Sequence, residues 1–255
     1  MIKITDLCFS YKSREIGRNI FKNIFRLNEI EVSLFNNLNV EIFNNDSKIT
    51  GFLGKNGAGK TTLIKLISGI LTPNSGNITV FGINSNGRPL NLLSNLGIVF
   101  GNKSMLWEEL SLYENIELFS KIYKRNYDNN NIENMIEMLS LNNIARKPAK
   151  TCSLGQSVKS NLLIHLLNRP KLLILDEPTI GLDIESQILL RNILKDYAEL
   201  NESKILITSH NMIDIADICT DILFLKGGEI SKIDLNKNDT KEKNALYLEG
   251  LFCDN

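Results

Sequence analysis

The residues with the clearest chemical potential form one glycine-rich stretch, Gly54-Lys55-Asn56-Gly57-Ala58-Gly59-Lys60-Thr61, which fits the pattern G-x-x-x-x-G-K-[ST]. It follows the apolar run KITGFLG and precedes the helical pattern KTTLIKLISGIL. Glycines let consecutive backbone N–H groups converge on phosphate oxygens, and a helix start adds its dipole. Lys60 offers a cation to β and γ phosphates, and Thr61 offers a hydroxyl to Mg²⁺. The stretch is predicted to bind phosphate; the alternative is a glycine-rich turn that binds no nucleotide.

Two adjacent carboxylates end another apolar run, LLILDEP. Asp176 is suited to face a metal ion held beside the phosphates. Glu177 has a longer side chain that can reach and polarise an attacking water as a general base. The alternative is a surface turn stopped by Pro178, and a neighbouring phosphate loop makes that alternative weaker.

The chain has two histidines, and their settings differ. His210 closes the apolar run ILITSH, and ligands of open α/β sheets bind at the carboxyl ends of the strands. His210 is therefore a candidate to contact a γ-phosphate. His165 lies inside the helical run LLIHLL and is interpreted as structural.

A second possible anion site is the stretch TCSLGQSVKS, residues 151–160. Ser153 can cap a helix, Gly155 lets a ligand approach the backbone, and an apolar run follows. Because a helix start has free N–H groups and a favourable dipole, it attracts anions. The sequence alone does not say whose phosphate this site would hold.

Alternating strand and helix patterns flank a mostly helical middle, about residues 104–168. Short apolar runs such as LLILD and KILIT are typical of buried parallel strands. We therefore expect an α/β fold with a parallel-sheet core and a helical insert instead of two independent domains.

The composition narrows the function classes. The 255 residues carry 29 Lys+Arg and 29 Asp+Glu, so no basic excess points to nucleic acid. The four cysteines are far apart and form no C-x-x-C pair, which favours reduced thiols. No run approaches the length of uncharged apolar residues that a membrane span needs, and the N-terminus does not resemble a signal peptide.

One segment, residues 13–31, separates the first two predicted strands and has a basic amphipathic pattern, with Arg18, Lys22 and Arg26 among isoleucines and phenylalanines. Such a pattern can contact lipid headgroups or a partner protein. The alternative is that it packs across a sheet edge.

The order GKNGAGKTT, SLGQ, LLILDEPTIGLD and ITSH resembles the ATP-binding subunit of an ABC transporter, and in particular the ATPases of ABC-2-type exporters. The resemblance implies a P-loop NTPase fold of the ABC ATPase type, with a mostly parallel core, an N-terminal antiparallel β subdomain and a helical subdomain between the phosphate loop and the signature SLGQ. It further implies one ABC ATPase domain over residues 1–255. Its RecA-like core would span about 1–101 and 169–235, its helical subdomain about 102–168, and a C-terminal extension about 236–255.

The resemblance also assigns roles to residues. Within one chain, ATP would contact Tyr11, which stacks on adenine, and the loop Gly54 to Thr62. The opposite chain of a pair would contribute Ser153, Gly155, Gln156 and Asp183 to the same ATP. Catalysis would involve Glu177, His210, Lys60 and Asn102, and Mg²⁺ would be held by Thr61, Asp176 and Asn102.

Two positions depart from the family pattern. Asn102, in VFGNKSMLW, stands where the family has a glutamine that contacts Mg²⁺ and water. Asparagine retains the amide but is one methylene shorter than glutamine. Either the loop lies closer and a metal-bound water is still held, or ATP turnover is slow. Leu154 stands in the signature where a glycine is usual, while Ser153, Gly155 and Gln156 remain.

The function implied by the resemblance is an ATPase subunit that pairs with an identical or a related chain and drives a transmembrane permease, with export as the expected direction of transport. It would lie in the cytoplasm, peripheral to the inner face of the cell membrane, with Leu106 and Trp107 as candidate permease contacts. The alternative that they belong to the core stays open. A rival function is a nucleotide-gated regulatory module with weak hydrolysis, which only Asn102 favours. A DNA-repair ATPase is disfavoured because no long heptad coiled coil is present.

Overall fold

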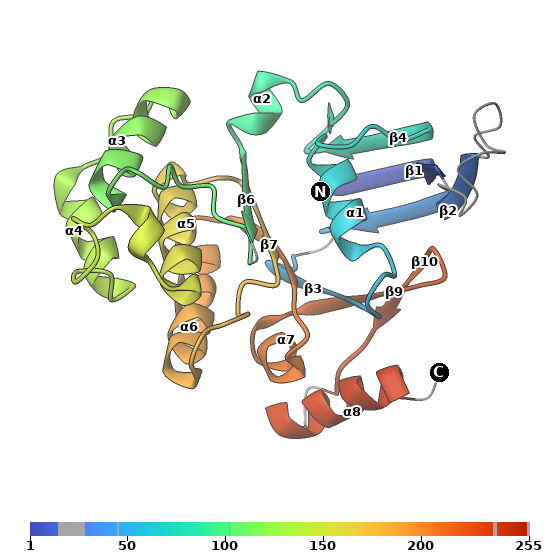
Figure 1. Ribbon diagram of the computed structural model, residues 1–255. Helices are drawn as coiled ribbons and strands as arrows, with labels where there is room; N and C mark the ends of the chain where they lie inside the picture. Colours follow the sequence, from blue (N-terminus) through green and yellow to red (C-terminus); the bar gives the residue numbers. More distant parts are fainter. Residues whose placement is uncertain (15–28, 45, 102, 237–238, 254–255) are drawn as a thin grey trace, which may run out of the picture.

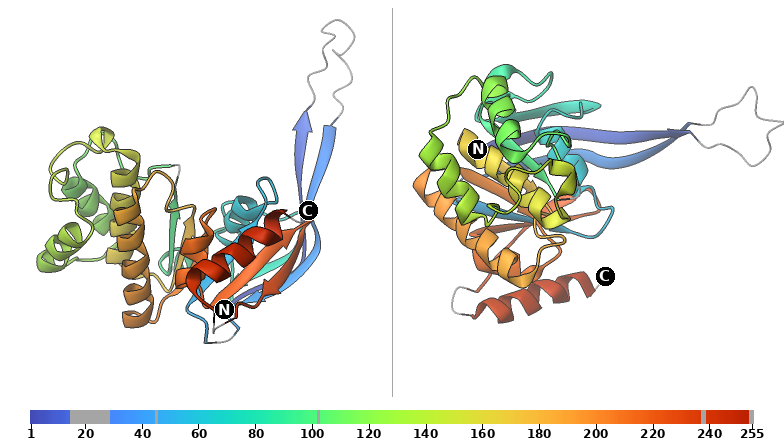
Figure 2. Two further views of the ribbon diagram at one scale, coloured as in Figure 1. Left: turned by 90° about the horizontal axis from the view of Figure 1, so that it is seen from below. Right: turned by 60° about the vertical axis from the view of Figure 1, so that its left-hand side comes forward.

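The computed structural model describes residues 1–14, 29–44, 46–101, 103–236 and 239–253. Its smaller sheet has the strand order β2-β1-β4-β5, and every pairing in it is antiparallel. The strands are β1 (Ile2–Arg14), β2 (Glu29–Ile42), β4 (Ser75–Val80) and β5 (Ile83–Asn84). In Figure 2 the paired β1 and β2 project beyond the rest of the described molecule.

The larger sheet has the order β10-β9-β3-β8-β7-β6 and contains the central parallel strands. Its strands are β3 (Ile49–Gly54), β6 (Leu96–Phe100), β7 (Leu172–Asp176), β8 (Lys204–Thr208), β9 (Asp221–Lys226) and β10 (Glu229–Ile233). Among the described strands of this sheet, β10 alone pairs antiparallel, with β9. Because β3, β7 and β8 run parallel as neighbours, their carboxyl ends meet at one edge.

The described helices are α1 (Lys60–Ile67), α2 (Leu90–Leu93), α3 (Leu112–Tyr123), α4 (Asn129–Met138), α5 (Leu154–Asn168), α6 (Ile184–Leu200), α7 (Met212–Ile218) and α8 (Lys241–Cys253). In Figure 1, helices α3 to α6 lie to the left of this sheet, α1 lies toward the antiparallel sheet, and α7 and α8 lie below. A 3₁₀ turn, Ala149–Thr151, precedes α5.

Alternate residues of the parallel strands face two separate cores, as the two-residue period of a strand requires. Leu172 and Ile174 of β7 pack in a core with α1 and the antiparallel sheet. Leu173 and Leu175 of the same strand pack in a second core with helices α3 to α7. The larger sheet is thus covered on both faces, which is the usual setting of a parallel sheet.

The expected architecture is confirmed: a mostly parallel core, an N-terminal antiparallel sheet and a helical segment that lies between β6 and β7. Two elements differ from the sequence expectation. Strand β2 begins at Glu29, inside the segment 13–31 that was expected to separate the first two strands, because it pairs along the full length of β1. Helix α8 was not predicted, and its buried Ala245 and Leu248 pack in the core with α7.

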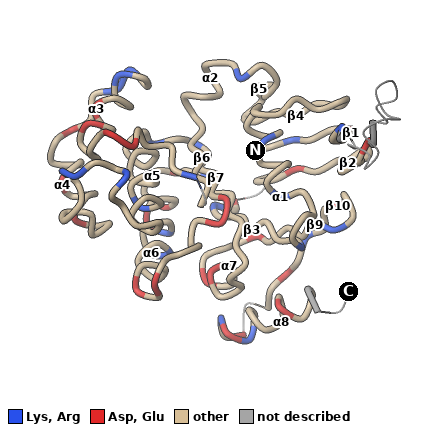
Figure 3. The backbone as a smooth tube through the Cα atoms, in the orientation of Figure 1, with Lys and Arg blue, Asp and Glu red and all other residues tan. Residues whose placement is uncertain are grey.

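Acidic and basic positions are interspersed along the described chain (Figure 3). Within the described ranges, no helix combines the length and the apolar character needed to cross a bilayer. Most of the amphipathic segment at residues 13–31 lies outside the described residues. The backbone at 13–14 and 29–31 continues the β1–β2 pairing.

Candidate active site

The predicted phosphate loop joins the end of β3 to the start of α1. Gly59, at the helix N-cap, has φ +109°, and Gly57 has φ +79°, so both hold backbone conformations that other residues rarely adopt. Lys60 folds over the loop and donates from Nζ to the carbonyl oxygens of Gly54 (2.6 Å) and Lys55 (3.3 Å). Burial lowers the pKa of the Lys60 ammonium. A buried cation surrounded by the loop is suited to receive an anion there.

Asp176 ends β7 directly beside the start of α1. Its Oδ2 accepts a hydrogen bond from the Thr61 hydroxyl (2.7 Å), and its Oδ1 accepts one from the Thr208 hydroxyl (2.7 Å). The two residues expected to hold Mg²⁺, Thr61 and Asp176, are therefore adjacent. A hydroxyl and a carboxylate oxygen are hard oxygen donors of the kind that Mg²⁺ prefers, so this donor set fits the ion.

Glu177 is held by several contacts although its backbone is unusual, with φ +58°. Its N–H donates to the carbonyl oxygen (3.2 Å) and the hydroxyl (3.0 Å) of Thr208. Its Oε2 accepts from the backbone N–H of His210 (3.1 Å), and its Oε1 lies 3.0 Å from His210 Nε2. Burial raises the pKa of the Glu177 carboxyl, against the opposing effects of His210 and Lys60. A carboxylate with a raised pKa is better matched to proton transfer near neutrality.

Tyr11 lies beside the phosphate loop. Its hydroxyl is 3.1 Å from the hydroxyl of Thr62, and its ring meets Phe9 edge to face with centroids 5.0 Å apart. Tyr11 is 42% exposed, so it remains accessible from solvent. The structure therefore brings together Tyr11 and the 54–62 loop, as well as Asp176, Glu177 and His210.

The signature stretch starts α5. The Ser153 hydroxyl accepts from the Gln156 N–H (3.2 Å), and the Gln156 side-chain oxygen accepts from the Ser153 N–H (2.9 Å). This capping box satisfies two groups at the helix start. Ser153 is exposed, so its helix start remains open to a ligand.

Within the chain, the signature stretch packs against the loop that carries Asp183. A methyl group placed on Gly155 would lie 2.9 Å from a Leu182 side-chain carbon, and one placed on Gly181 would lie 2.7 Å from Leu154. Asp183 caps α6 by accepting from the Ser186 N–H (2.7 Å), and this bond lowers the pKa of its carboxyl. Ser153, Gly155, Gln156 and Asp183 thus form a second group, joined by close contacts between α5 and the loop 181–182.

Comparisons with known proteins show the family to which the chain belongs. The family model described as ABC transporter matches residues 35–180. The chain belongs to the ABC transporter family. The predicted family is therefore confirmed. The predicted enzyme class, an ABC-type ATPase, is confirmed with it.

Individual relatives support the same assignment. The chain is 32% identical over 202 residues to the uncharacterized ABC transporter ATP-binding protein YdbJ of Bacillus subtilis (strain 168), covering 79% of this chain and 65% of YdbJ. It is 31% identical over 230 residues to the lantibiotic transport ATP-binding protein SrtF of Streptococcus pyogenes, covering 90% of this chain and 89% of SrtF. The chain thus spans about two thirds of the length of YdbJ.

A solved structure shares the fold. It is described as the dimeric, post-hydrolysis state of an ATP-binding cassette bound to ADP and Pi. It superposes with a TM-score of 0.70 at 20% identity and covers 92% of this chain and 100% of that chain. At this identity the likeness shows the ABC ATPase fold alone.

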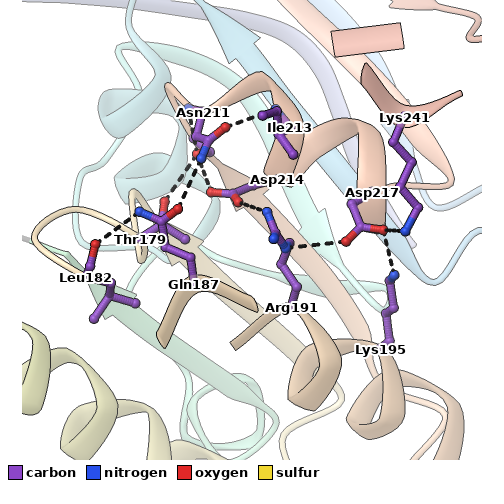
Figure 4. Close-up of polar contacts among 11 residues, drawn as sticks. Thr179, Leu182, Gln187, Arg191, Lys195, Asn211, Ile213, Asp214, Asp217 and Lys241 are labelled. Carbon is purple, nitrogen blue, oxygen red and sulfur yellow. Dashed lines mark hydrogen bonds and ion pairs between the residues drawn. The ribbon is translucent and has the colours of Figure 1, made fainter. Parts of the chain in front are cut away.

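Sequence reasoning missed a link between the loop after β7 and the loop after β8 of this ABC ATPase (Figure 4). Gln187 donates from Nε2 to the Leu182 carbonyl oxygen (3.1 Å) and accepts from Asn211 Nδ2 (3.3 Å). Asn211 follows His210 and caps α7. Only the polar type of Gln187 hints at this role in the sequence, since the bridge depends on how α6 and α7 pack.

A buried ion network continues from the same region (Figure 4). Arg191 Nη1 lies 2.7 Å from Asp214 Oδ1, and Arg191 Nε lies 3.3 Å from Asp217 Oδ2. Asp214 is fully buried, whereas Asp217 also pairs with Lys195 (2.9 Å) and with Lys241 of α8. Helices α6, α7 and α8 are therefore joined through charges just beyond the His210 loop.

The remaining sequence expectations have separate outcomes. Asn102 lies outside the described residues. Leu106 is 6% exposed and belongs to the core, so its assignment as a permease contact is wrong, whereas Trp107 is 59% exposed. His165 is buried in α5, and burial lowers its pKa to about 4, as suits a structural histidine. The described cysteines, Cys8, Cys152 and Cys219, are free thiols.

Proposed function

We propose that this chain binds and hydrolyses ATP, as one of two ATPase subunits that drive a transmembrane permease. The observation that carries the proposal is the cluster at the carboxyl ends of β3, β7 and β8. Lys60, Thr61 and Asp176 meet there, and Glu177 is hydrogen-bonded to His210. Ligands of open α/β sheets bind at this edge.

Each residue of the cluster has a task that its contacts support. Lys60 brings its charge to the β and γ phosphates, and the glycine-rich loop and the start of α1 supply N–H groups. Glu177 polarises the attacking water as general base, and His210 orients its carboxylate and faces the γ-phosphate. Thr61 and Asp176 hold Mg²⁺, which neutralises charge on the phosphates when bound. Tyr11 stacks on adenine, next to Thr62.

We place the second group of site residues in a shared site. Ser153, Gly155 and Gln156, with Asp183, face the ATP held by the other chain of a head-to-tail pair. Exposed Ser153 at a helix start and the dimeric description of the solved ABC cassette support this. The partner is a second copy of this chain or a related ATPase subunit.

The transport role rests on the relatives. SrtF is described as a lantibiotic transport protein, and by analogy we assign this chain to an exporter. The subunit would then lie at the cytoplasmic face of the membrane, held by the permease. Exposed Trp107, at the start of the helical segment 102–168, is the described candidate for permease contact.

Steady-state phosphate release from Mg²⁺-ATP tests the enzymatic proposal. Wild-type protein is expected to turn over ATP, and Glu177→Gln, which keeps size and hydrogen bonding but removes the base, is expected to lose most of that rate. A wild-type rate no higher than that of Glu177→Gln would contradict the proposal. It would favour a nucleotide-gated regulatory module, the function that Asn102 in place of a glutamine also favours.

A further inference from the structure

Gly101, the residue directly after β6, approaches the backbone of Glu177 unusually closely. Its N–H donates to the Asp176 carbonyl oxygen (2.7 Å), which extends the β6–β7 pairing by one residue. A methyl group placed on Gly101 would lie 2.0 Å from the Glu177 carbonyl oxygen and 2.8 Å from the Glu177 carbonyl carbon. Both contacts are with backbone atoms, so no side chain can rotate away to make room.

The Glu177 backbone has no simple way to withdraw. Its φ of +58° is uncommon for a residue with a side chain. Its N–H is bonded to Thr208 on one side, and its carboxylate is bonded to His210 on the other. The carbonyl group occupies the space that Gly101 leaves. A displaced carbonyl would therefore rotate the residue that carries the carboxylate.

We propose that Gly101 is a positioning residue for hydrolysis, because its missing side chain permits the left-handed backbone that directs the Glu177 carboxylate to His210. The inference rests on the proposed function and adds a residue to it. Gly101 acts through Glu177 and does not itself touch ATP. The loop around Lys60 is built by β3 and α1 and contacts other atoms, so nucleotide binding does not depend on Gly101.

The same strand supplies a matched control. Gly97, near the start of β6, has a non-positive φ, and a methyl group there would meet side-chain carbons of Leu173 and Pro170 at 3.0 Å instead of backbone. Gly97→Ala thus adds the same methyl group within β6 itself, four residues before Gly101 and away from Glu177.

The experiment compares Gly101→Ala with Gly97→Ala for kcat, for ADP affinity by calorimetry and for melting temperature. Gly101→Ala is expected to lower kcat by about 100-fold, the size expected for a misplaced catalytic group, with ADP affinity and KM near those of the wild type. Gly97→Ala is expected to keep the wild-type kcat. In the Glu177→Gln background, Gly101→Ala should cause no further loss, because both changes act on one carboxylate.

Several results would overturn the inference. For Gly101→Ala, these results are a wild-type kcat, a loss of ADP affinity parallel to the loss of kcat, or a protein that does not fold. For the comparison variants, they are an equal loss of kcat in Gly97→Ala or an additive loss of kcat in the double variant with Glu177→Gln. A wild-type protein without ATP turnover would overturn the proposed function and this inference with it. An active wild type with an unaffected Gly101→Ala would overturn the inference alone.

Discussion

At the scale of single residues, the neighbours of Glu177 set the properties of the carboxylate that we propose as the general base. Glu177 is partly buried, and this burial raises the pKa of its carboxyl, while His210 and Lys60 act in the opposite direction. A general base works only when it is deprotonated. Hydrolysis should therefore rise as pH increases through the pKa of Glu177.

This balance predicts how a change at His210 affects the pH profile. His210→Gln removes a group that lowers the Glu177 pKa, so that pKa rises. The rate constant of hydrolysis is measured in single turnovers at saturating protein. The acid limb of this rate constant against pH is expected to move to higher pH. An acid limb at the wild-type position would show that His210 does not influence the base.

The motifs of this site could be predicted from the sequence because each ends a short apolar strand. Gly54 and Asp176 are the last residues of β3 and β7, His210 follows β8 closely, and parallel neighbours bring the carboxyl ends of these strands together. The left-handed backbone of Glu177 and its contact with Gly101 could not be predicted, because they depend on the approach of β6 to β7.

At the scale of elements, helix starts and helix contacts shape the site. Helices α3 and α5 both begin with a complete capping box, at Ser111 with Glu114 and at Ser153 with Gln156. Only the second belongs to the predicted shared site. The two serines therefore form a natural pair for comparison.

Replacing either capping serine should cost stability, and only one should cost activity. Ser153→Ala and Ser111→Ala are each expected to lower the free energy of unfolding by about 1 kcal/mol, measured by urea denaturation. Ser153→Ala should also reduce ATP turnover, because the proposed shared site places its hydroxyl at the ATP of the other chain. Equal turnover in the two variants would remove Ser153 from the site.

The ion network that joins α6 and α7 should contribute strongly to stability. Arg191→Met leaves the fully buried Asp214 without its partner, and the loss of one member of a buried pair costs about 3–5 kcal/mol. Lys121→Met, which removes an exposed pair with Glu117, is the control and is expected to cost less than about 0.5 kcal/mol. Similar denaturation midpoints for the two variants would contradict this assignment.

Element boundaries show where sequence patterns were insufficient. Helix α8 has buried Ala245 and Leu248 but exposed Leu246 and Tyr247, so its pattern gives no single apolar face. Its packing on α7 and the bond from Lys241 to Asp217 fix its place instead. Strand β2 extends because β1 pairs with it, which a local pattern does not report.

At the scale of the whole molecule, the ABC ATPase fold was predictable because motif order and strand–helix alternation indicate the same architecture. The division into a core of about 1–101 and 169–235, a helical part of about 102–168 and an extension of about 236–255 stays a prediction. Lys60 and Glu177 interact in one group, and the start of α5 after Ser153 packs against the loop before Asp183 in another. The account requires a second chain to bring these two groups to one ATP.

The mass of Glu177→Gln in solution, measured by light scattering with and without saturating Mg²⁺-ATP, tests that requirement most directly. Without the base, ATP persists, so the account predicts a monomer that becomes a dimer of twice the mass when ATP is added. Lys60→Met in the same background, which removes the phosphate contact, should stay monomeric as the control. A Glu177→Gln protein that binds ATP and remains a monomer at saturation would contradict the shared site.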